Sequence, residues 1–337
     1  MKILLYTGNI NVVEKSGVGR AIKQQLKFLE DNKIPFTVNI KDSYDIIHLN
    51  TVFPDSFIMS VIAKIKGKKI VYHAHSTKED FENSFCGSNF LAPLFKKWIM
   101  LCYNMGDLII TPTEYSKKLL YEYRLRKPIV TISNGIDLDF YKRDGEKGRL
   151  FREKYGFRKQ DKIIMSVGLH IKRKGILDFV ELAKILPEYQ FVWFGYTDPK
   201  IIPKEVRNAV GIKLPNLHFP GYISREELRD AYNGSDLFLF LTYEETEGIV
   251  LLEALAMKIP VLVRDIDIYK NWLSDGRDVY KGSGILDFYN KIREIINGDL
   301  PDITEAGYET VKKKDIKTCG KRLIFQYIKL AANKKTL

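Results

Sequence analysis

Thr242–Pro260, TYEETEGIVLLEALAMKIP, joins a cluster of acids to an apolar run through a single glycine, Gly248. Good helix formers fill Ile249–Met257 and a proline follows them, so we predict a short helix there. Because that helix is apolar almost all round, it is expected to be buried, and the acid inside it, Glu253, then needs a partner. Gly248 would let a ligand approach the helix N-terminus, where free N–H groups favour an anion. The alternative is a buried helix with one satisfied glutamate.

The composition indicates a globular protein of two domains. A chain of 337 residues is long enough for two cores, and 45% apolar with 28% charged residues is ordinary for soluble proteins. No apolar run approaches the roughly 18 residues that span a bilayer, and the N-terminal MKILLYTGN is expected to be a strand rather than a signal peptide. Three distant cysteines fit neither a disulfide framework nor a metal site, which favours a reducing cytoplasm.

The net charge of +12 suits nucleic acid, an anionic membrane surface or an anionic ligand. Nine of its cations, against one acid, fall in Lys312–Lys335, which is either a solvated basic helix or a surface for anions. Because the sequence contains no recognisable RNA- or DNA-reading motif, a nucleic-acid partner is not expected.

The first half of the chain alternates short apolar stretches with helical patterns, which argues for a parallel, doubly wound sheet. Ligands of such sheets lie beyond the carboxyl ends of the strands. Two predicted strands end there in polar residues, His48–Thr51 and His73–Thr77. Either histidine could be a packed residue; we favour packing for His48 and a site for His75. The predicted strands are Met1–Thr7, Phe36–Ile40, Asp45–Leu49, Lys69–His73, Leu108–Thr111 and Ile129–Ile132.

The second half repeats this alternation after a polar linker at Lys142–Gly148. A strand at Lys162–Val167 leads to a helix that begins at Arg173-Lys174-Gly175. Two cations beside a glycine at a helix N-terminus suit a pyrophosphate.

Glu245 and Glu253, separated by seven residues across the glycine turn and followed by Ala-Leu-Ala, resemble the signature of the large retaining glycosyltransferase family with the GT-B fold (group 1, family 4). The segment Asn134–Asp137 is similar to the family's NG-[VI]-D, which marks the end of the first domain. The resemblance implies an α/β fold of two Rossmann-like domains that face a cleft. We expect the domains at 1–141 and 148–317, with 318–337 crossing back to the first domain.

The resemblance also implies roles for single residues. Glu245 would contact the donor sugar with His75 opposite, and Glu253 would bind the ribose. Lys174 matches the family's phosphate-binding lysine; this chain has Leu169 where the family usually carries a second cation, and Arg173 is expected to replace it. We expect no metal, because these cations and the helix N-terminus already compensate a leaving diphosphate. The expected donor-binding residues are Glu253, Gly248, Gly17, Gly19, Thr246 and Glu247.

Phe81–Tyr103, FENSFCGSNFLAPLFKKWIMLCY, combines aromatic and aliphatic residues with a lysine pair. This composition is typical of an interfacial segment, and equally of a core helix with a basic edge. In lipid-modifying members of the family this region receives the acceptor and touches the membrane. The expected acceptor or membrane residues are Phe95, Lys96, Lys97 and Trp98.

Several stretches of the first half resemble the family's bacterial enzymes that extend a glucosyl-diacylglycerol: SGVGRAIK, HLNT, HAHST with KEDF and NSF, and LAPLFKKW. The resemblance implies transfer of glucose or galactose from a UDP-sugar co-substrate to a membrane glycolipid. The enzyme would act in the cytoplasm, as a peripheral protein on the inner face of the cell membrane beside anionic lipid. The alternatives are a transferase of capsule or cell-wall assembly and, from another class, a sugar-nucleotide 2-epimerase, which needs no membrane-facing segment.

Overall fold

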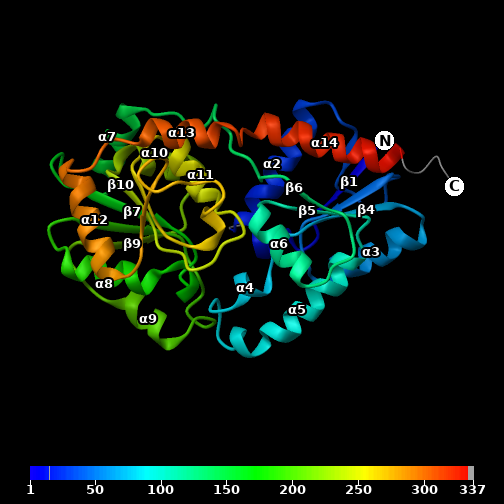
Figure 1. Ribbon diagram of the computed structural model, residues 1–337, viewed down its shortest axis with the longest axis horizontal. Helices are drawn as coiled ribbons and strands as arrows, with labels where there is room; N and C mark the ends of the chain where they lie inside the picture. Colours follow the sequence, from blue (N-terminus) through cyan, green and yellow to red (C-terminus); the bar gives the residue numbers. More distant parts are fainter. Residues whose placement is uncertain (15, 333–337) are drawn as a thin grey trace.

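Two parallel six-stranded sheets lie side by side in the computed structural model, which describes residues 1–14 and 16–332 (Figure 1). The first sheet has the strand order β2-β1-β3-β4-β5-β6. Its strands are short and almost wholly buried, as expected for a sheet covered on both faces. They are β1 (Ile3–Tyr6), β2 (Phe36–Thr37), β3 (Ile46–Leu49), β4 (Lys69–His73), β5 (Leu108–Thr111) and β6 (Ile129–Thr131).

Alternate residues of these strands enter two different cores. Ile3 packs with Phe28 and Leu323, whereas Leu4 packs with Met59 and Tyr103. The helices of the first half are therefore divided between the two faces of the sheet. They are α1 (Ile10–Val13), α2 (Gly17–Asp31), α3 (Pro54–Ile65), α4 (Lys78–Phe81), α5 (Ser88–Asn104) and α6 (Glu114–Glu122).

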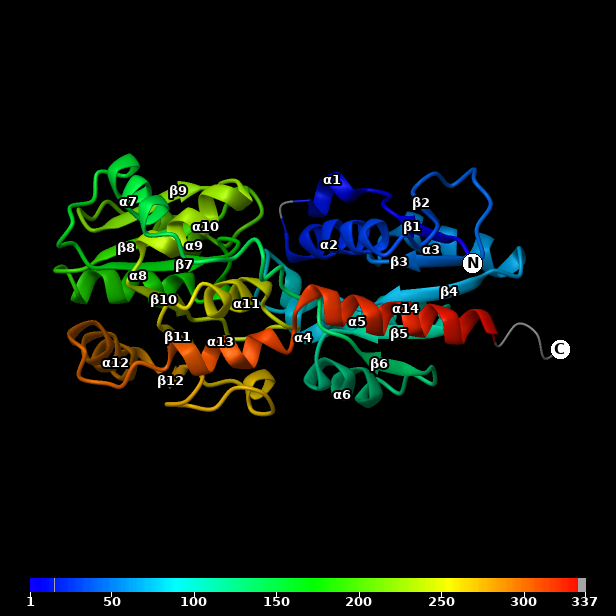
Figure 2. The ribbon, with the colours of Figure 1, turned by 90° about the horizontal axis from the view of Figure 1, so that it is seen from above.

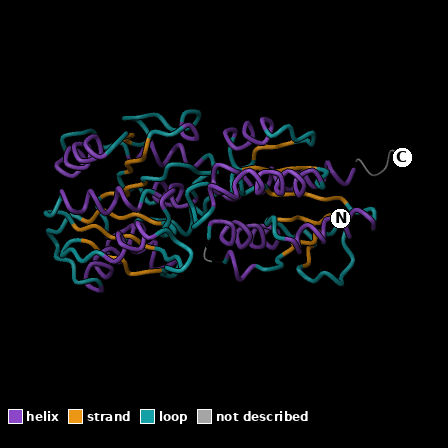
Figure 3. Tube along the Cα trace, turned by 90° about the horizontal axis from the view of Figure 1, so that it is seen from below, coloured by secondary structure: helices purple, strands orange, loops and turns teal. Residues whose placement is uncertain are grey.

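The second sheet has the order β12-β11-β10-β7-β8-β9, again with parallel neighbours. Helices lie on both sides of its strands (Figure 3). Its strands are β7 (Ile163–Val167), β8 (Gln190–Phe194), β9 (Leu217–Gly221), β10 (Leu237–Phe240), β11 (Val261–Arg264) and β12 (Tyr280–Gly282). Its helices are α7 (Gly145–Lys154), α8 (Ile176–Ile185), α9 (Lys204–Gly211), α10 (Arg225–Gly234), α11 (Ile249–Ala256), α12 (Ile285–Asn297) and α13 (Thr304–Lys312), with 3-10 turns at Lys172–Lys174 and Asp267–Tyr269.

The last helix, α14 (Ile316–Ala332), crosses from the second half to the first (Figure 2). It packs on α2 so closely that a Cβ at Gly320 would lie 1.7 Å from the Phe28 ring. The expected crossing of 318–337 is thus seen as far as Ala332; residues 333–337, with the last part of the basic stretch Lys312–Lys335, lie outside the described residues. Since α14 joins the core of Ile3 and α5 joins that of Leu4, the two helices cover opposite faces of one sheet.

Three local expectations were wrong. Helix α7 begins at Gly145, inside the expected linker, because the Asp144 carboxylate caps it by accepting from the backbone N–H groups of Glu146 and Lys147. Strand β2 ends at Thr37 rather than residue 40. Phe81–Tyr103 is not one segment: α4 ends at Phe81 and α5 begins after Gly87, whose φ of 78° favours glycine.

Candidate active site

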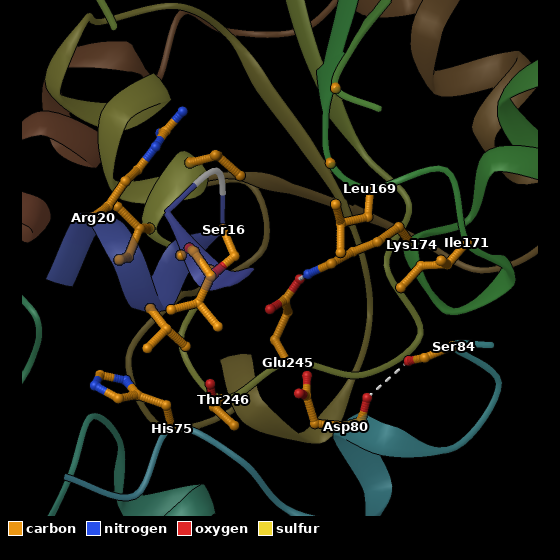
Figure 4. A pocket seen from close by; sticks show the side chains of 18 of the residues that line it. Ser16, Arg20, His75, Asp80, Ser84, Leu169, Ile171, Lys174, Glu245 and Thr246 are labelled. Carbon is orange, nitrogen blue, oxygen red and sulfur yellow. Dashed lines mark hydrogen bonds and ion pairs between the residues drawn. The ribbon is translucent and has the colours of Figure 1, made fainter. Parts of the chain in front are cut away.

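A pocket of about 510 Å³ lies between the two halves, at the carboxyl ends of their strands (Figure 4). Both halves line it. The first half contributes Gly17, Arg20, His75, Asp80, Ser84 and Phe95, and the second half contributes Lys174, Glu245, Thr246, Glu247, Gly248 and Ile249, among others.

The N-terminus of α11 lies at this pocket, as the sequence predicted. Gly248 caps the helix with a φ of 81°, and a Cβ there would lie 3.1 Å from the Phe240 ring. Backbone conformation and packing therefore both favour glycine at this turn. The absence of a side chain leaves the helix N-terminus open to an anion.

Glu253 is 2% exposed and is partnered by two side chains. The Tyr232 hydroxyl donates to its Oε2 at 3.1 Å, and the Arg20 guanidinium forms an ion pair with its Oε1. Arg20 comes from α2 in the other half of the molecule, and it lines the pocket. The partner that this buried acid requires is thus supplied across the cleft.

Lys174 and Glu245 form a second ion pair, within the second half. Glu245 is 5% exposed, and Figure 4 shows the ammonium and the carboxylate meeting in the pocket. Burial lowers the pKa of Lys174 from its ordinary value, and the Glu245 carboxylate opposes that shift. The pair places one cation and one carboxylate in the pocket. A bound anion could pair with the Lys174 ammonium, and the Glu245 carboxylate would then be free to accept other hydrogen bonds.

Arg173 turns away from this pair towards the first half. Its guanidinium forms an ion pair with Asp80 at 2.9 Å and donates to Ser84 Oγ at 3.1 Å, both in or beside α4. It also donates to the Glu244 carbonyl at 2.8 Å. These contacts disfavour its expected place beside the donor diphosphate, which stays a prediction.

His75 lies at the edge of the pocket, on the far side from Lys174 in Figure 4. Its Nε2 is 3.0 Å from the Asn50 amide oxygen, and its ring stacks on His73 at 4.2 Å between centroids. Burial lowers the pKa of His75 to about 3, so the ring is neutral. Because an amide oxygen only accepts, Nε2 carries the proton and Nδ1 is left as an acceptor. His48 is fully buried and hydrogen-bonded to Tyr327, the packed role expected for it.

Thr246 and Glu247 attach the glycine turn to the first half. The Thr246 carbonyl accepts from Thr113 Oγ1 at 2.9 Å. The Glu247 carboxylate accepts from the backbone and side-chain nitrogens of Asn134 at 2.9 and 2.8 Å and from Ser133, and it pairs with Lys314 at 3.2 Å. With these partners Glu247 joins the junction of the halves, a geometry that disfavours its expected contact with the donor.

Glycine is favoured for different reasons at the two positions of the first helical turn of α2. Gly17 lines the pocket, where a Cβ would approach Ile249 of α11 at 4.0 Å. A Cβ at Gly19 would lie 2.5 Å from the carbonyl oxygens of Val13 and Glu14. Gly19 is therefore required by packing, and the structure gives it no place in the pocket lining.

Three of the four expected acceptor or membrane residues are half-buried and pack on other residues of the first half. Phe95 stacks on Phe81 at 4.2 Å and lines the pocket. Trp98 Nε1 donates to the Val52 carbonyl at 2.6 Å, and Lys96 lies 4.2 Å from the Tyr123 ring. Of the four, Lys97 is the exposed one. The place of Trp98 at a membrane edge stays a prediction, which its packing disfavours, because the partly buried indole contacts Phe57 beside the core.

The outer side of α5 carries a different set of apolar residues. Phe90, Leu94 and Leu101 are 88%, 66% and 49% exposed. With Lys97 they follow the spacing i, i+4, i+7, i+11, which places all four on one face of the helix. We call these four residues the α5 stripe. It has the make-up of an interfacial surface, apolar with a cation.

Arg20 and Asp80 are site residues that the sequence analysis does not predict. Both lie beside predicted site segments: Arg20 directly follows the glycine loop, and Asp80 lies shortly after His75. Among the described residues, no group of three or more His, Cys, Asp and Glu side chains is placed to hold a metal ion. No helix within 1–14 and 16–332 is long and apolar enough to cross a membrane.

Two family models match the chain: Glycosyltransferase Family 4 over residues 24–140 and Glycosyl transferases group 1 over residues 149–309. The processive diacylglycerol alpha-glucosyltransferase of Acholeplasma laidlawii is 38% identical over 325 residues, which are 96% of each chain. The alpha-galactosylglucosyldiacylglycerol synthase of Streptococcus pneumoniae (strain ATCC BAA-255 / R6) is 28% identical over 76% of this chain and 69% of that protein.

Solved structures confirm the expected fold. The crystal structure of Anabaena Alr3699/HepE in complex with UDP-glucose matches with a TM-score of 0.76 at 17% identity. The match covers 98% of this chain and 100% of the HepE chain. Sucrose-phosphate synthase from Thermosynechococcus elongatus has a TM-score of 0.75 at 18% identity, over 92% of this chain and 78% of its own. The arrangement of two α/β halves around a cleft is therefore GT-B.

Proposed function

Because the chain belongs to the group 1 (family 4) glycosyltransferases, we propose that it transfers glucose or galactose from a UDP-sugar to glucosyl-diacylglycerol. The product would be a diglycosyl-diacylglycerol. The observation that carries the proposal is the relationship to the A. laidlawii diacylglycerol glucosyltransferase along 96% of both chains. The putative teichuronic acid biosynthesis glycosyltransferase TuaC of Bacillus subtilis (strain 168) matches less of the chain, 73%, at 24% identity.

The donor would bind in the cleft pocket. The N-terminus of α11 and Lys174 would compensate the negative charge of the diphosphate. Stabilising the charge that develops on the leaving group is the main task of such a site. Glu245, released from Lys174, would accept hydrogen bonds from the sugar hydroxyls. Glu253 would hold the ribose, provided that Arg20 gives way or shares its carboxylate.

The reaction would retain the anomeric configuration and need no divalent metal. Lys174 and the α11 N–H groups would supply the positive charge that a metal supplies elsewhere. The donor carbon would be attacked on the face that the diphosphate leaves, as the family resemblance implies.

The acceptor would enter from a membrane surface. The α5 stripe offers apolar side chains and a cation to an anionic bilayer, and Phe81 and Phe95 line the pocket on the same half. The enzyme would then work as a peripheral protein on the cytoplasmic face of the cell membrane, with glycolipid and anionic lipid as its partners.

Product analysis tests the proposal. The enzyme is incubated with UDP-glucose or UDP-galactose and glucosyl-diacylglycerol in anionic liposomes, with chelator present. We expect a diglycosyl-diacylglycerol with an α-linkage from one of the two donors. A sugar-nucleotide 2-epimerase would instead release an epimerised sugar and leave the lipid unchanged, and that outcome would overturn the proposal.

A further inference from the structure

Two neighbouring cations in the cleft, Arg173 and Lys174, form ion pairs with carboxylates of different halves of the molecule. Lys174 pairs with Glu245 of the second half, while Arg173 pairs with Asp80 of the first half at 2.9 Å. Both residues belong to one 3-10 turn, Lys172–Lys174, whose tight geometry sends successive side chains in different directions. The cleft therefore contains two carboxylates, each with its own cation.

Asp80 is fixed in place and still faces the pocket. It lies in the first turn of α4, where its backbone N–H bonds Thr77 Oγ1 at 3.1 Å and its carbonyl accepts from Ser84 Oγ at 3.0 Å (Figure 4). Its side chain is 24% exposed, against 8% for Arg173, and it lines the pocket. Part of the carboxylate is thus held by the guanidinium and part stays open to a ligand.

The surroundings of Asp80 differ from those of Glu245. Burial raises the pKa of Asp80, and the Arg173 guanidinium opposes that shift. Phe81 follows it directly and stacks on Phe95, which also lines the pocket. Asp80 therefore stands between the donor-side pair Lys174–Glu245 and the aromatic side of the pocket.

We propose that Asp80, held by Arg173, binds the acceptor hydroxyl that attacks the donor sugar. This inference rests on the proposed function, and it gives the acceptor side of the site its polar contact. In the reaction, the acceptor oxygen forms a bond to the anomeric carbon while the bond from that carbon to the diphosphate oxygen breaks. The hydroxyl proton leaves with the UDP, and Asp80 orients the hydroxyl by accepting its hydrogen bond until then.

The test separates acceptor use from donor use. In Asp80→Asn, which keeps the shape of the side chain, we expect kcat/KM for glucosyl-diacylglycerol to fall about 100-fold or more. The KM for the UDP-sugar and the slow hydrolysis of the donor by water should stay within about threefold of wild type. Asp80→Glu should recover part of the transfer, because it restores a carboxylate.

A matched variant controls for structure. Glu79→Gln changes the neighbouring acid, whose carboxylate accepts from the Tyr123 hydroxyl and does not line the pocket. It should transfer at close to the wild-type rate. Equal losses of donor hydrolysis and of transfer in Asp80→Asn, or a loss in Glu79→Gln as large as that in Asp80→Asn, would overturn the proposal.

Failure of the proposed function looks different. In that case the wild-type enzyme makes no diglycosyl-diacylglycerol from either UDP-sugar. Active wild type with an unaffected Asp80→Asn variant would leave the function standing and reject Asp80 alone.

Discussion

Arg20 of α2 and Glu253 of α11 form an ion pair between residues 233 positions apart, and it joins the two halves of the molecule across the cleft. Glu253 is 2% exposed and the Arg20 side chain 21%, so the pair is largely removed from water. Its contribution to the protein depends on both partners being present, because either charge alone would be buried uncompensated.

Arg20→Ala should therefore destabilise the protein by about 3–5 kcal/mol in chemical denaturation. Glu253→Gln should cost less, because a neutral amide can still accept from Tyr232. The double variant should be more stable than Arg20→Ala alone. Lys23→Ala is the control: its pair with Glu14 is exposed, and its loss should cost less than about 1 kcal/mol. An equal loss of unfolding free energy in Arg20→Ala and Lys23→Ala would show that the buried pair contributes no more to stability than an exposed pair.

Donor binding gives a second prediction for Glu245 and Lys174. Glu245→Gln should nearly abolish transfer, by about 100- to 1000-fold in kcat, with the unfolding midpoint close to wild type. Lys174→Met should lower kcat in the same range and also weaken UDP binding in calorimetry, since the cation would compensate the diphosphate. Glu253→Gln should chiefly weaken nucleotide binding. Wild-type turnover in Glu245→Gln would remove the basis for its assignment.

The pH dependence of stability should isolate Glu244. Burial raises the pKa of Glu244 to about 7, although a hydrogen bond from Tyr115 opposes the shift. The folded protein thus holds a proton there that the unfolded chain releases near its ordinary carboxylate pKa. The free energy of unfolding contributed by Glu244 should be present at low pH and lost as pH rises through about 7.

Buried histidines act in the opposite sense. Burial lowers the pKa of His48 and His75 to about 3, so their contribution is lost as pH falls below the ordinary histidine range. The measurement is therefore the difference between wild type and Glu244→Gln, from denaturation at pH 5 to 8. A difference that stays constant over this range would contradict the raised pKa.

Membrane binding should depend on the α5 stripe. Phe90→Ser with Leu94→Ser should weaken sedimentation with anionic liposomes at least tenfold, because each apolar side chain is worth about 1.5–3 kcal/mol when fully buried. Phe325→Ser with Ile328→Ser on α14, also exposed, is the matched control on the opposite face of the sheet. Binding should also fall with added salt, since the Lys97 contribution is screened beyond about 8 Å. If the α14 variant lost binding and the α5 variant did not, α14 would be the membrane surface.

The segment between α4 and α5 gives a fifth prediction. Phe85 packs against the core of the second half, and the Cys86 N–H donates to the Ile201 carbonyl at 3.0 Å. We call residues 82–87 the cleft bridge. Ile201→Cys should form a disulfide with Cys86 under mild oxidation, because a backbone hydrogen bond brings the two Cα atoms close enough.

We expect the oxidised Ile201→Cys variant to bind UDP but to lose transfer, and reductant to restore it, if entry of the lipid acceptor requires the halves to separate. The other two cysteines, Cys102 and Cys319, are buried, so oxidised wild type should stay active. Full turnover by the cross-linked form would mean that the bridge stays closed through the reaction.

The sequence predicted those features of the structure that depend on neighbouring residues in the chain. The α11 helix and the glycine at its N-terminus could be predicted because capping and burial act over a few residues. The partner of Glu253 could not be identified, since Arg20 reaches it only after both halves have folded. Composition also could not predict which side of α5 faces solvent. Trp98 and Phe90 are both aromatic, but Trp98 packs on Phe57 whereas Phe90 is 88% exposed.

The cleft bridge ends at Gly87, and α5 starts with the next residue. The helix that would rest on the bilayer and the loop that lines the pocket are therefore joined directly, with no further residues between them. A tilt of α5 as its stripe enters the lipid headgroups would pull on Phe85 and on the Arg173 contacts at once. Binding to a membrane would then help to open the cleft towards the acceptor. Away from a membrane, the cleft would stay closed and exclude water from the sugar donor.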